Sequence, residues 1–255
     1  MNAIAAVIPA FNEEATIRDV VERALRQVAR VIVVDDGSSD GTCAVLGGLP
    51  VTVLRNERNL GKARSLIRGM EEAFGHGALA VVTLDGDGQH PPEEIPRLLP
   101  AQSAEPRSIA IGSRLHDAAN VPLDRYLANR FANFWIAWAA GQRVEDSQSG
   151  FRVYSETAWR EVLPRCCGEG FVFESEVLIE AGRAGFQLLS VPIPAIYAAR
   201  ARRSHFRPVL DIARITRMVA WKLLARGLYL SGLIRSLRAD GLEQSEASRE
   251  AGPTG

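Results

Sequence analysis

Short apolar runs alternate with amphipathic helical stretches through the first half of the chain. Each apolar run ends in turn-forming residues, and the helical stretches carry apolar residues at a spacing of three and four. Strands and helices that alternate in this way build βαβ units, which predicts an α/β fold with a mainly parallel sheet flanked by helices. The expected strands are Ala3–Ile8, Val31–Val34, Val51–Leu54, Ala78–Leu84 and Ile109–Ile111, and the expected helices include Glu14–Val28 and Ala63–Phe74. After the second strand, Ser39 or Asp40 is expected to cap a short helix.

The composition fits a cytoplasmic domain of this class. The chain has 255 residues, 47% of them hydrophobic, which is enough for a substantial core, and its net charge of zero does not favour nucleic-acid binding. The three cysteines lack metal-ligand spacing, which suits a reducing compartment. Pro9 breaks the N-terminal apolar run, and the longest uncharged stretches are shorter than the ~20 residues of a spanning helix. We therefore expect neither a signal peptide nor a membrane-spanning segment.

The fourth expected strand ends in two carboxylates, Asp85 and Asp87. Gly86 and Gly88 let the backbone turn there, and ligands of open α/β sheets bind in the crevice beyond the carboxyl ends of the strands. Two close carboxylates repel each other, and a hard cation such as Mg²⁺ or Mn²⁺ would relieve that repulsion and bring a diphosphate with it. The alternative is a polar Asp-Gly turn with solvated acids, which is a common arrangement.

Polar residues also follow the first two expected strands, as Asn12–Glu13 and Asp35–Asp36. The carboxyl ends of parallel strands share one edge, so we expect these loops and the Asp85–Asp87 turn to converge on one crevice. Asp36 could bind a ribose or a base edge there, or serve as a turn or cap residue. Glu13 could be a ligand, or an acid favoured at a helix start. Lys62 follows Gly61, but the complete phosphate-loop motif of NTPases does not occur.

The second half is less regular and more basic. Its expected elements are a helix at Tyr126–Ala140, a polar loop at 145–150, a helix at Phe171–Ala184 and a strand at Phe186–Ile193. Residues 200–226 then hold eight basic side chains against one acid, and the last residues are small and polar. We expect a catalytic domain over residues 1–200, basic amphipathic helices over 201–238 and a disordered tail over 239–255.

The expected C-terminal helix has two unlike faces. Apolar side chains line one face, namely Val209, Ile212, Ile215, Val219 and Leu223. The other face gathers Arg207, Arg214, Trp221 and Lys222. A basic face with a tryptophan beside an apolar stripe is typical of helices at a membrane surface, which predicts peripheral attachment to the inner membrane face. The alternative is that the stripe packs on the sheet domain and the arginines face water.

Six motifs occur in a fixed order along the chain. They are Val7–Glu14, Val33–Thr42, Asn59–Lys62, Leu84–Pro91, Gly112–Arg114 and Asp146–Arg152. Any one of them is weak, but together they resemble glycosyltransferase family 2, and within it the polyprenol-phosphate branch that includes enzymes similar to dolichol-phosphate mannose synthase. The resemblance spans most of the chain, from about Ala3 to Arg214.

This resemblance implies a single domain of the nucleotide-diphospho-sugar (GT-A) fold and sugar transfer with inversion, from a UDP- or GDP-sugar. By analogy the donor contacts would be Pro9, Phe11, Glu13, Val34, Asp36, Lys62, Asp85, Gly86, Asp87 and Gln89. Asp85, Asp87 and Gln89 would bind the Mg²⁺ or Mn²⁺ ion, and the expected catalytic residues are Asp87, Arg114 and Asp146. An acceptor phosphate would meet Arg114, Arg125, Arg130, Arg200 and His205. His205 stands where the branch has lysine, a departure from the pattern.

The nature of the acceptor decides what chemistry the site needs. A sugar hydroxyl needs a general base, for which Asp146 is the candidate, whereas a lipid monophosphate is already mostly ionised, with a second pKa of about 6. Such a phosphate needs positive charge to position it, and Arg125, Arg130, Arg152 and the basic segment from Arg200 supply it. This favours a polyprenyl-phosphate acceptor.

Several alternatives stay open. The arginines near the start of the Tyr126–Ala140 helix could be solvated or stack on Phe131 and Trp135, and Asp146 could pair with Arg152. The chain could act on a hydroxyl acceptor, could be a sugar nucleotidyltransferase, or could bind nucleotide sugars without catalysis. The nucleotidyltransferases begin with a glycine-rich loop that is absent after the first strand here.

Overall fold

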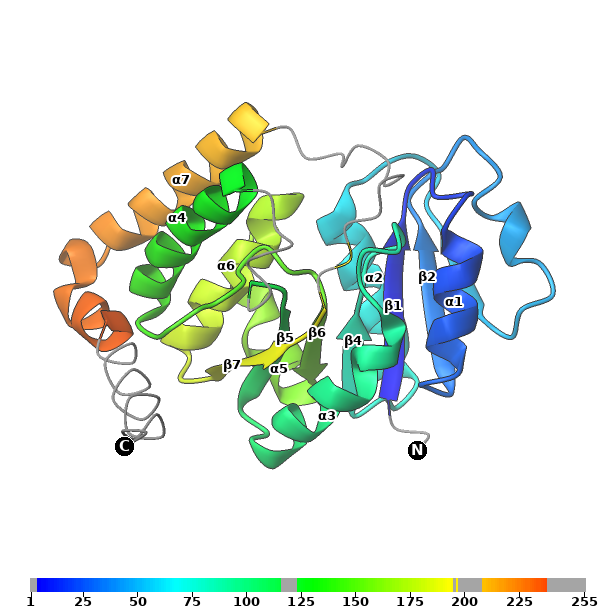
Figure 1. Cartoon of the computed structure of the whole chain (residues 1–255), viewed down its shortest axis with the longest axis horizontal. Helices are drawn as coiled ribbons and strands as arrows, with labels where there is room; N and C mark the ends of the chain where they lie inside the picture. The colour runs from blue at the N-terminus through cyan, green and yellow to red at the C-terminus, as the bar shows by residue number, and fades with distance from the viewer. Residues whose placement is uncertain (1–3, 116–122, 195, 197–207, 238–255) are drawn as a thin grey trace, which may run out of the picture.

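A seven-stranded mixed sheet forms the centre of the molecule (Figure 1). The structure is a computed structural model, which describes residues 4–115, 123–194, 196 and 208–237. The strands are β1 Ile4–Ala10, β2 Arg30–Asp35, β3 Thr52–Arg55, β4 Ala80–Thr83, β5 Ser108–Ser113, β6 Arg152–Ser155 and β7 Gln187–Pro192. Their order is β3-β2-β1-β4-β6-β5-β7, and β6 runs antiparallel to both of its neighbours while the other pairs are parallel. The predicted mainly parallel α/β sheet is therefore confirmed.

Helices cover both faces of this sheet. They are α1 Ile17–Leu25, α2 Lys62–Gly75, α3 Ile95–Ala104, α4 Leu123–Ala140, α5 Glu156–Glu161, α6 Phe171–Arg183 and α7 Pro208–Leu224. Within the described ranges, short 3₁₀ turns accompany them at Ala44–Leu46 (η1), Pro92–Glu94 (η2), Leu163–Arg165 (η4) and Gly227–Tyr229 (η5). Side chains of a strand point alternately to the two faces, so β1 sends Val7 into one core and Ile8 into the other. The first core packs under α2, α4, α6 and α7, and the second under α1 and α3.

Strand β1 continues two residues beyond its predicted end. Pro9 pairs with Val34 and Ala10 with Asp35, whereas the pairing of β1 with β4 stops at Val7 and Thr83. The carbonyl of Val7 accepts a bond from Leu84 on the β4 side, and Pro9 has the same orientation two residues later. Its missing N–H therefore falls where the β4 ladder has already ended, and the proline does not break the strand.

The helix expected after Ser39 and Asp40 is only the 3₁₀ turn η1, and no side chain caps it. Asp40 instead accepts hydrogen bonds from the backbone N–H and the hydroxyl of Thr42 within its own loop. The prediction that Ser39 or Asp40 caps a helix is wrong, because the Asx-type bond inside the loop takes the place of the cap.

Helix α7 packs its apolar stripe against the body of the protein. Ile215, Val219 and Leu223 are buried, which agrees with the alternative that the stripe packs on the protein, and Trp221 is exposed. The prediction for Lys222 is wrong: its ammonium lies 2.9 Å from Glu176 and 2.7 Å from Glu180 on α6. Lys222 follows Val219 by three residues, so it lies beside the stripe rather than opposite to it. The side chains of Arg207, Val209 and Ile212 and the predicted tail lie outside the described part.

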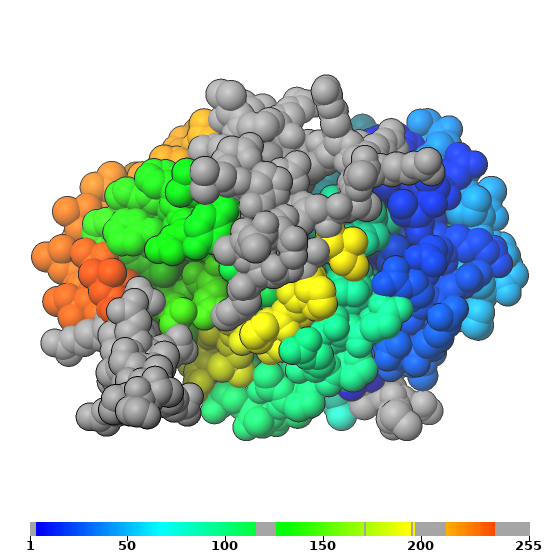
Figure 2. Space-filling view, viewed as in Figure 1, coloured from blue at the N-terminus to red at the C-terminus, as the bar shows by residue number. Residues whose placement is uncertain are grey.

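In the described ranges, no helix combines the length and the apolar character that crossing a membrane requires. Helix α4 and residues 208–237 lie side by side at one end of the molecule, far from the first strands (Figure 2). A hydrogen bond from the indole of Trp138 to the carbonyl of Tyr229 joins these two segments.

Candidate active site

Strands β2, β1 and β4 are neighbours, so the polar loops that follow them meet at one edge of the sheet. The predicted convergence of the loops after Ala10, Asp35 and Thr83 is therefore present in the fold. The hydroxyl of Thr16, just after the first loop, donates a 2.7 Å hydrogen bond to the carbonyl of Gly86 in the third. The three loops thus form one connected surface at the carboxyl end of the sheet.

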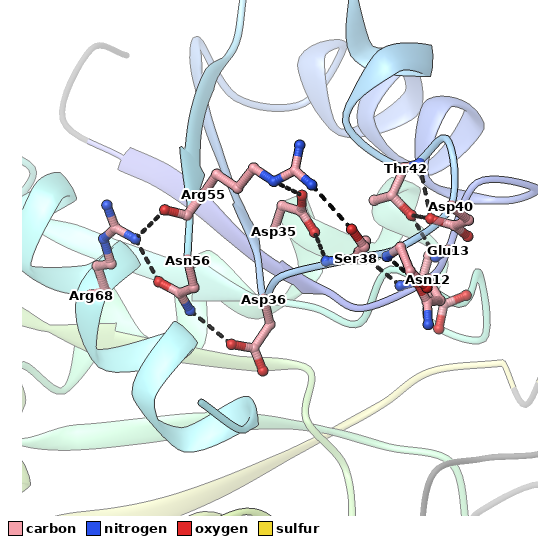
Figure 3. A network of polar contacts seen from close by, with 11 residues as sticks. Asn12, Glu13, Asp35, Asp36, Ser38, Asp40, Thr42, Arg55, Asn56 and Arg68 are labelled. Atoms are coloured by element: carbon pink, nitrogen blue, oxygen red, sulfur yellow. Dashed lines mark hydrogen bonds and ion pairs between the residues drawn. The ribbon is translucent and has the colours of Figure 1, made fainter. Parts of the chain in front are cut away.

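Hydrogen bonds interlock the first two loops (Figure 3). Asn12, in the left-handed region with φ of 57°, accepts a 2.8 Å bond from the N–H of Ser39 and donates its own N–H to the hydroxyl of Ser38 at 2.8 Å. The N–H of Glu13 donates to the hydroxyl of Thr42, also at 2.8 Å. Asparagine tolerates a positive φ better than most residues do, so this turn is compatible with its sequence.

Asp36 orders the loop that leads into α2. Its carboxylate accepts bonds from the N–H groups of Leu60 and Gly61, both at 2.8 Å, and from the side-chain amide of Asn56 at 2.7 Å. Gly61 has a φ of 92°, and α2 begins at the next residue, Lys62. Asp36 therefore acts as a cap supplied from another loop, and its contact with a nucleotide stays a prediction.

Asp85 is neutralised by a lysine. The Nζ of Lys62 lies 2.6 Å from Oδ1 of Asp85 and 3.0 Å from Oε2 of Glu174, which lies in the first turn of α6. Burial on its own would raise the pKa of Asp85, but the Lys62 ammonium outweighs burial and holds that pKa at about 2. The N–H of Asp85 donates to Nδ1 of His90 at 3.3 Å, and burial lowers the pKa of this histidine to about 4. His90 is therefore neutral at neutral pH and accepts a bond at Nδ1.

Asp87 experiences the repulsion that the sequence suggested. Burial, followed by the charge of Asp85, raises the pKa of Asp87 to about 6. Its Oδ1 accepts a 3.0 Å bond from the N–H of Gln89. Within the part of the chain that the structure describes, no three His, Cys, Asp or Glu side chains form a metal-binding group. The two carboxylates nevertheless suit Mg²⁺ or Mn²⁺, because these ions bind one or two protein carboxylates together with phosphate oxygens and water.

Arg114 forms an ion pair with the fully buried Asp146 beside this edge. Oδ2 of Asp146 accepts bonds from the backbone N–H of Arg114 at 3.1 Å and from its Nε at 3.0 Å, and Oδ1 accepts from Nη2 at 3.3 Å. Burial would raise the pKa of Asp146, but Arg114 lowers it below the ordinary value. Asn133 of α4 holds the loop around Asp146, because its side chain bonds to the carbonyl of Glu145 and to the N–H of Ser147. Asp146 pairs with Arg114 and not with Arg152.

Arg152 is a structural residue, so the prediction that it supplies charge for an acceptor phosphate is wrong. It is fully buried at the start of β6, between β4 and β5. Its guanidinium donates to the carbonyls of Ser149 at 2.8 Å, Ser147 at 2.9 Å and Glu174 at 2.7 Å. The central place of β6 in the sheet explains why this arginine faces protein carbonyls instead of a ligand.

The other predicted donor residues differ in accessibility. Pro9 and Phe11 are half-buried at the end of β1, and Gly86 packs close to Ile17 and the carbonyl of Pro9. The side chain of Val34 is fully buried in the core, so only its main chain could contact a nucleotide.

The predicted acceptor arginines are only partly described. Arg130 is exposed on α4, where its guanidinium lies 5.8 Å from the ring centre of Tyr126 and donates to the Tyr126 hydroxyl at 3.3 Å. Arg130 thus lies over an aromatic ring of its own helix, as one of the alternatives for these arginines proposed, but this ring belongs to Tyr126. Arg125 also belongs to α4, but its side chain, like Arg200 and His205, lies outside the described part.

A groove of about 300 Å³ begins at the end of β5 and runs along α4. Ser113 and Leu115, on either side of Arg114, form one end, and Ser236 and Leu237 belong to the wall supplied by the C-terminal segment. The remaining lining residues are Tyr126, Arg130, Asn133, Phe134, Ala137, Arg143, Val144 and Glu145. The groove thus combines two arginines and one acid with polar and apolar side chains, next to the Arg114–Asp146 pair.

Sequence reasoning missed Glu174 and gave no role to His90. Glu174 is a charged residue in the apolar run that begins α6, which is a weak signal for a site residue. Its partner Lys62 is more than a hundred residues away, so only the fold reveals the contact. His90 lies close to Asp85 in the sequence, but its burial depends on Phe151, whose ring centre is 5.6 Å from that of His90.

A family model described as glycosyl transferase family 2 matches residues 5–180. The chain belongs to glycosyltransferase family 2. This glycosyltransferase is 30% identical over 212 residues to UDP-N-acetylglucosamine--dolichyl-phosphate N-acetylglucosaminyltransferase of Methanococcus voltae, covering 75% of this chain and 84% of that one. It is 31% identical over 200 residues to polyprenol monophosphomannose synthase of Mycolicibacterium smegmatis, covering 73% and 75%. The predicted resemblance to the polyprenol-phosphate branch is confirmed by these relatives.

The fold of the glycosyltransferase also matches a solved structure. Glucosyl-3-phosphoglycerate synthase from Mycobacterium tuberculosis, in complex with UDP, superposes with a TM-score of 0.60 at 24% identity over 88% of this chain and 80% of that one. At this identity the likeness bears on the fold alone, and it confirms the predicted GT-A architecture.

Proposed function

We propose that this glycosyltransferase moves a sugar, with inversion, from a UDP- or GDP-sugar to a polyprenyl phosphate at the inner membrane surface. The observation that carries the proposal is the groove next to Arg114, whose lining includes Arg130 and the apolar side chains of Phe134 and Leu237. A groove with both arginines and apolar side chains in its lining suits an acceptor that has an anionic head and a hydrocarbon chain. Relatives named for dolichyl-phosphate and polyprenol acceptors support the same substrate class.

The donor would bind at the acidic edge of the sheet. Asp85 and Asp87, with Gln89, would hold Mg²⁺ or Mn²⁺, and a bound cation would offset the negative charge that develops on the departing nucleoside diphosphate. Solved structures of the glucosyl-3-phosphoglycerate synthase contain UDP with Mg²⁺ or with Mn²⁺, which supports a divalent cation at this fold's donor site. The interlocked loops of β1 and β2 would seat the nucleoside, because their backbone is already ordered by hydrogen bonds.

Arg114 would orient the acceptor phosphate next to the donor. Asp146 holds the guanidinium by two bonds, which fixes its plane and preorganises its charge. An ionised phosphate oxygen needs no general base to attack the anomeric carbon, so positioning by Arg114 and Arg130 is the main requirement. Arg125, Arg200 and His205 would add to the positive field around the phosphate.

The same geometry weighs against a hydroxyl acceptor. In that alternative Asp146 would remove a proton, but its carboxylate is buried, accepts three bonds from Arg114 and has a lowered pKa. A carboxylate held in this way is a weak base. The hydroxyl alternative is therefore the less favoured one.

Exposed apolar side chains support the membrane location. Phe131 and Phe134 on α4 are 61% and 43% exposed, and Trp221 on α7 is 72% exposed. Further exposed apolar residues follow at Leu224, Leu228, Leu230, Ile234 and Leu237. We define this set, with Leu127, as the outer apolar surface. It flanks the groove, so a prenyl chain could pass from a lipid bilayer into the site.

A transfer assay tests the proposal. Purified protein is incubated with Mn²⁺, a short polyprenyl phosphate and labelled UDP- or GDP-sugars, and the lipid product is quantified with and without EDTA. We expect a glycosyl phospholipid from at least one donor and its loss with EDTA. Product on a hydroxyl acceptor together with none on the lipid phosphate would select the alternative.

A further inference from the structure

Glu174 joins helix α6 to the acidic edge of the sheet. It lies in the first turn of α6, and its carboxylate shares the ammonium of Lys62 with Asp85, at 3.0 Å and 2.6 Å. The side chains of Lys62 and Glu174 are only 19% and 10% exposed. A charge bridge between three separate elements, α2, α6 and the loop after β4, therefore closes one side of the site.

Contacts at the main chain and at the carboxylate fix the position of Glu174. Arg152 donates a 2.7 Å bond to its main-chain carbonyl, so the first turn of α6 is tied to a buried guanidinium. Around the carboxylate, Gly150 of the loop before β6 lies close. If Gly150 had a Cβ atom, that atom would lie 2.9 Å from Nζ of Lys62, 3.0 Å from Oε1 of Glu174 and 3.1 Å from Oδ2 of Asp85. The loop before β6 therefore approaches the three charged groups closely, and a side chain at Gly150 would displace them.

The charges of this region leave a negative excess. The acids are Asp85, Asp87, Asp146 and Glu174, and the cations are Lys62, Arg114 and the buried Arg152. Four negative and three positive charges leave a negative excess of one, which favours the binding of a cation such as Mg²⁺ or Mn²⁺. If Glu174 lost its charge, more of the attraction of the Lys62 ammonium would fall on Asp85. The ammonium would then compete with the divalent cation for the same oxygen.

We propose that Glu174 is a positioning residue of the donor site. It holds Lys62 between two carboxylates, keeps Asp85 accessible to a divalent cation and thereby sets the affinity of the site for that cation. The inference rests on the metal-dependent transfer proposed above, because it assumes that Asp85 and Asp87 bind the metal.

The test is the dissociation constant of Mn²⁺, measured without nucleotide by the loss of the free-ion signal in electron paramagnetic resonance. We expect Glu174→Gln to weaken Mn²⁺ binding about tenfold, because the Lys62 ammonium is then held by Asp85 alone and competes more strongly for its oxygen. We expect Lys62→Met to tighten Mn²⁺ binding, because it removes that competing cation. Glu180→Gln is the matched control. It makes the same change on the same helix, but Glu180 pairs with Lys222, and we expect its Mn²⁺ affinity to equal that of the wild type.

The outcomes separate the two proposals. If the wild type binds no Mn²⁺, the metal site in the proposed function is wrong. If the wild type binds Mn²⁺ and Glu174→Gln stays within twofold of it, the positioning role is wrong. The double variant Lys62→Met/Glu174→Gln should bind like Lys62→Met alone. An equally large loss without Lys62 would mean that Glu174 acts on the cation directly. Should Glu174→Gln fail to fold, unchanged or weaker binding by Lys62→Met would still contradict the inference.

Discussion

The loops after β1, β2 and β4, which we call the donor edge, differ from the outer apolar surface in which side chains they bury and which they expose. At the donor edge the polar groups are buried and paired: Asp36 accepts three bonds from one loop, and Lys62 bridges two carboxylates. On α4 and residues 208–237 large apolar side chains face outward, with Trp221 72% exposed. A rigid polar site suits a diphosphate that must be held in one geometry, whereas an exposed apolar surface suits a fluid partner such as a lipid bilayer. The groove along α4 connects the two regions.

Loss of a carboxylate at the donor edge should have the largest effect. We expect Asp87→Ala to lower the rate of transfer to polyprenyl phosphate about 10³-fold, because the leaving diphosphate loses its electrostatic stabilisation. Steady-state kinetics with Mn²⁺ measures this. Asp19→Asn, an exposed acid on α1, is the control and should keep the wild-type rate. A rate for Asp87→Ala within tenfold of the wild type would remove this residue from the mechanism.

Breaking the pair between Arg114 and Asp146 should cost stability as well as activity. We expect Asp146→Asn to lower the free energy of unfolding by about 3 kcal/mol at pH 7, because the largely buried guanidinium of Arg114 loses the negative charge of this carboxylate. The pKa of Asp146 is lowered in the folded state, so its charge stabilises the protein above the unfolded pKa of about 4. The difference from the wild type should therefore shrink as the pH falls below about 4.

Urea unfolding from pH 3 to pH 7 measures this difference. Glu161→Gln, which breaks an exposed pair with Arg107, is the control and should have no measurable effect. A constant difference between Asp146→Asn and the wild type at all pH values would show that the ion pair is not its source.

A substitution in the groove should weaken binding of the acceptor and leave binding of the nucleotide sugar unchanged. We expect Arg130→Met to raise the KM for polyprenyl phosphate about 30-fold and to leave the KM of the nucleotide sugar unchanged, because a charge-assisted phosphate contact contributes about 2 kcal/mol. Arg107→Met, away from the groove, should change neither constant. Equal rises in both KM values would place Arg130 in donor binding and weaken the comparison.

Single substitutions in the outer apolar surface should have the smallest effects of those predicted. We expect Phe131→Ser and Trp221→Ser each to weaken binding to anionic vesicles about tenfold, because each removes a large apolar side chain from the bilayer contact. Vesicle cosedimentation measures this affinity. Leu79→Ser is a matched control, since Leu79 is 64% exposed but lies between α2 and β4, outside this surface. If all three variants bind alike, the outer apolar surface does not face the membrane.

The sequence predicted the donor edge better than the rest of the molecule. Asp85 and Asp87 follow a buried strand and flank Gly86, so local pattern and parallel-sheet geometry together locate them. The pairs that shape the site join residues far apart in the chain, as Arg114 with Asp146 and Lys62 with Glu174, and local pattern carries no information on such partners.

Two errors arose from the same cause. Arg152 looked available as a phosphate contact, but the insertion of β6 between β4 and β5 buries it. Lys222 was placed on the basic face opposite the apolar stripe, but it pairs with Glu176 and Glu180 on α6. Helical spacing alone does not reveal acids on a neighbouring helix. In both cases tertiary packing decided the role of a basic side chain.

The most direct measurement is a competition between two acceptors that differ in one group. Polyprenyl phosphate and the polyprenol of the same chain length are offered together with a nucleotide sugar and Mn²⁺, and both lipid products are quantified. A site that pairs an acidic donor edge with acceptor arginines predicts product on the phosphate, and at most a trace on the alcohol. Product mainly on the alcohol would contradict it, because the arginines of the groove would then have no anionic partner.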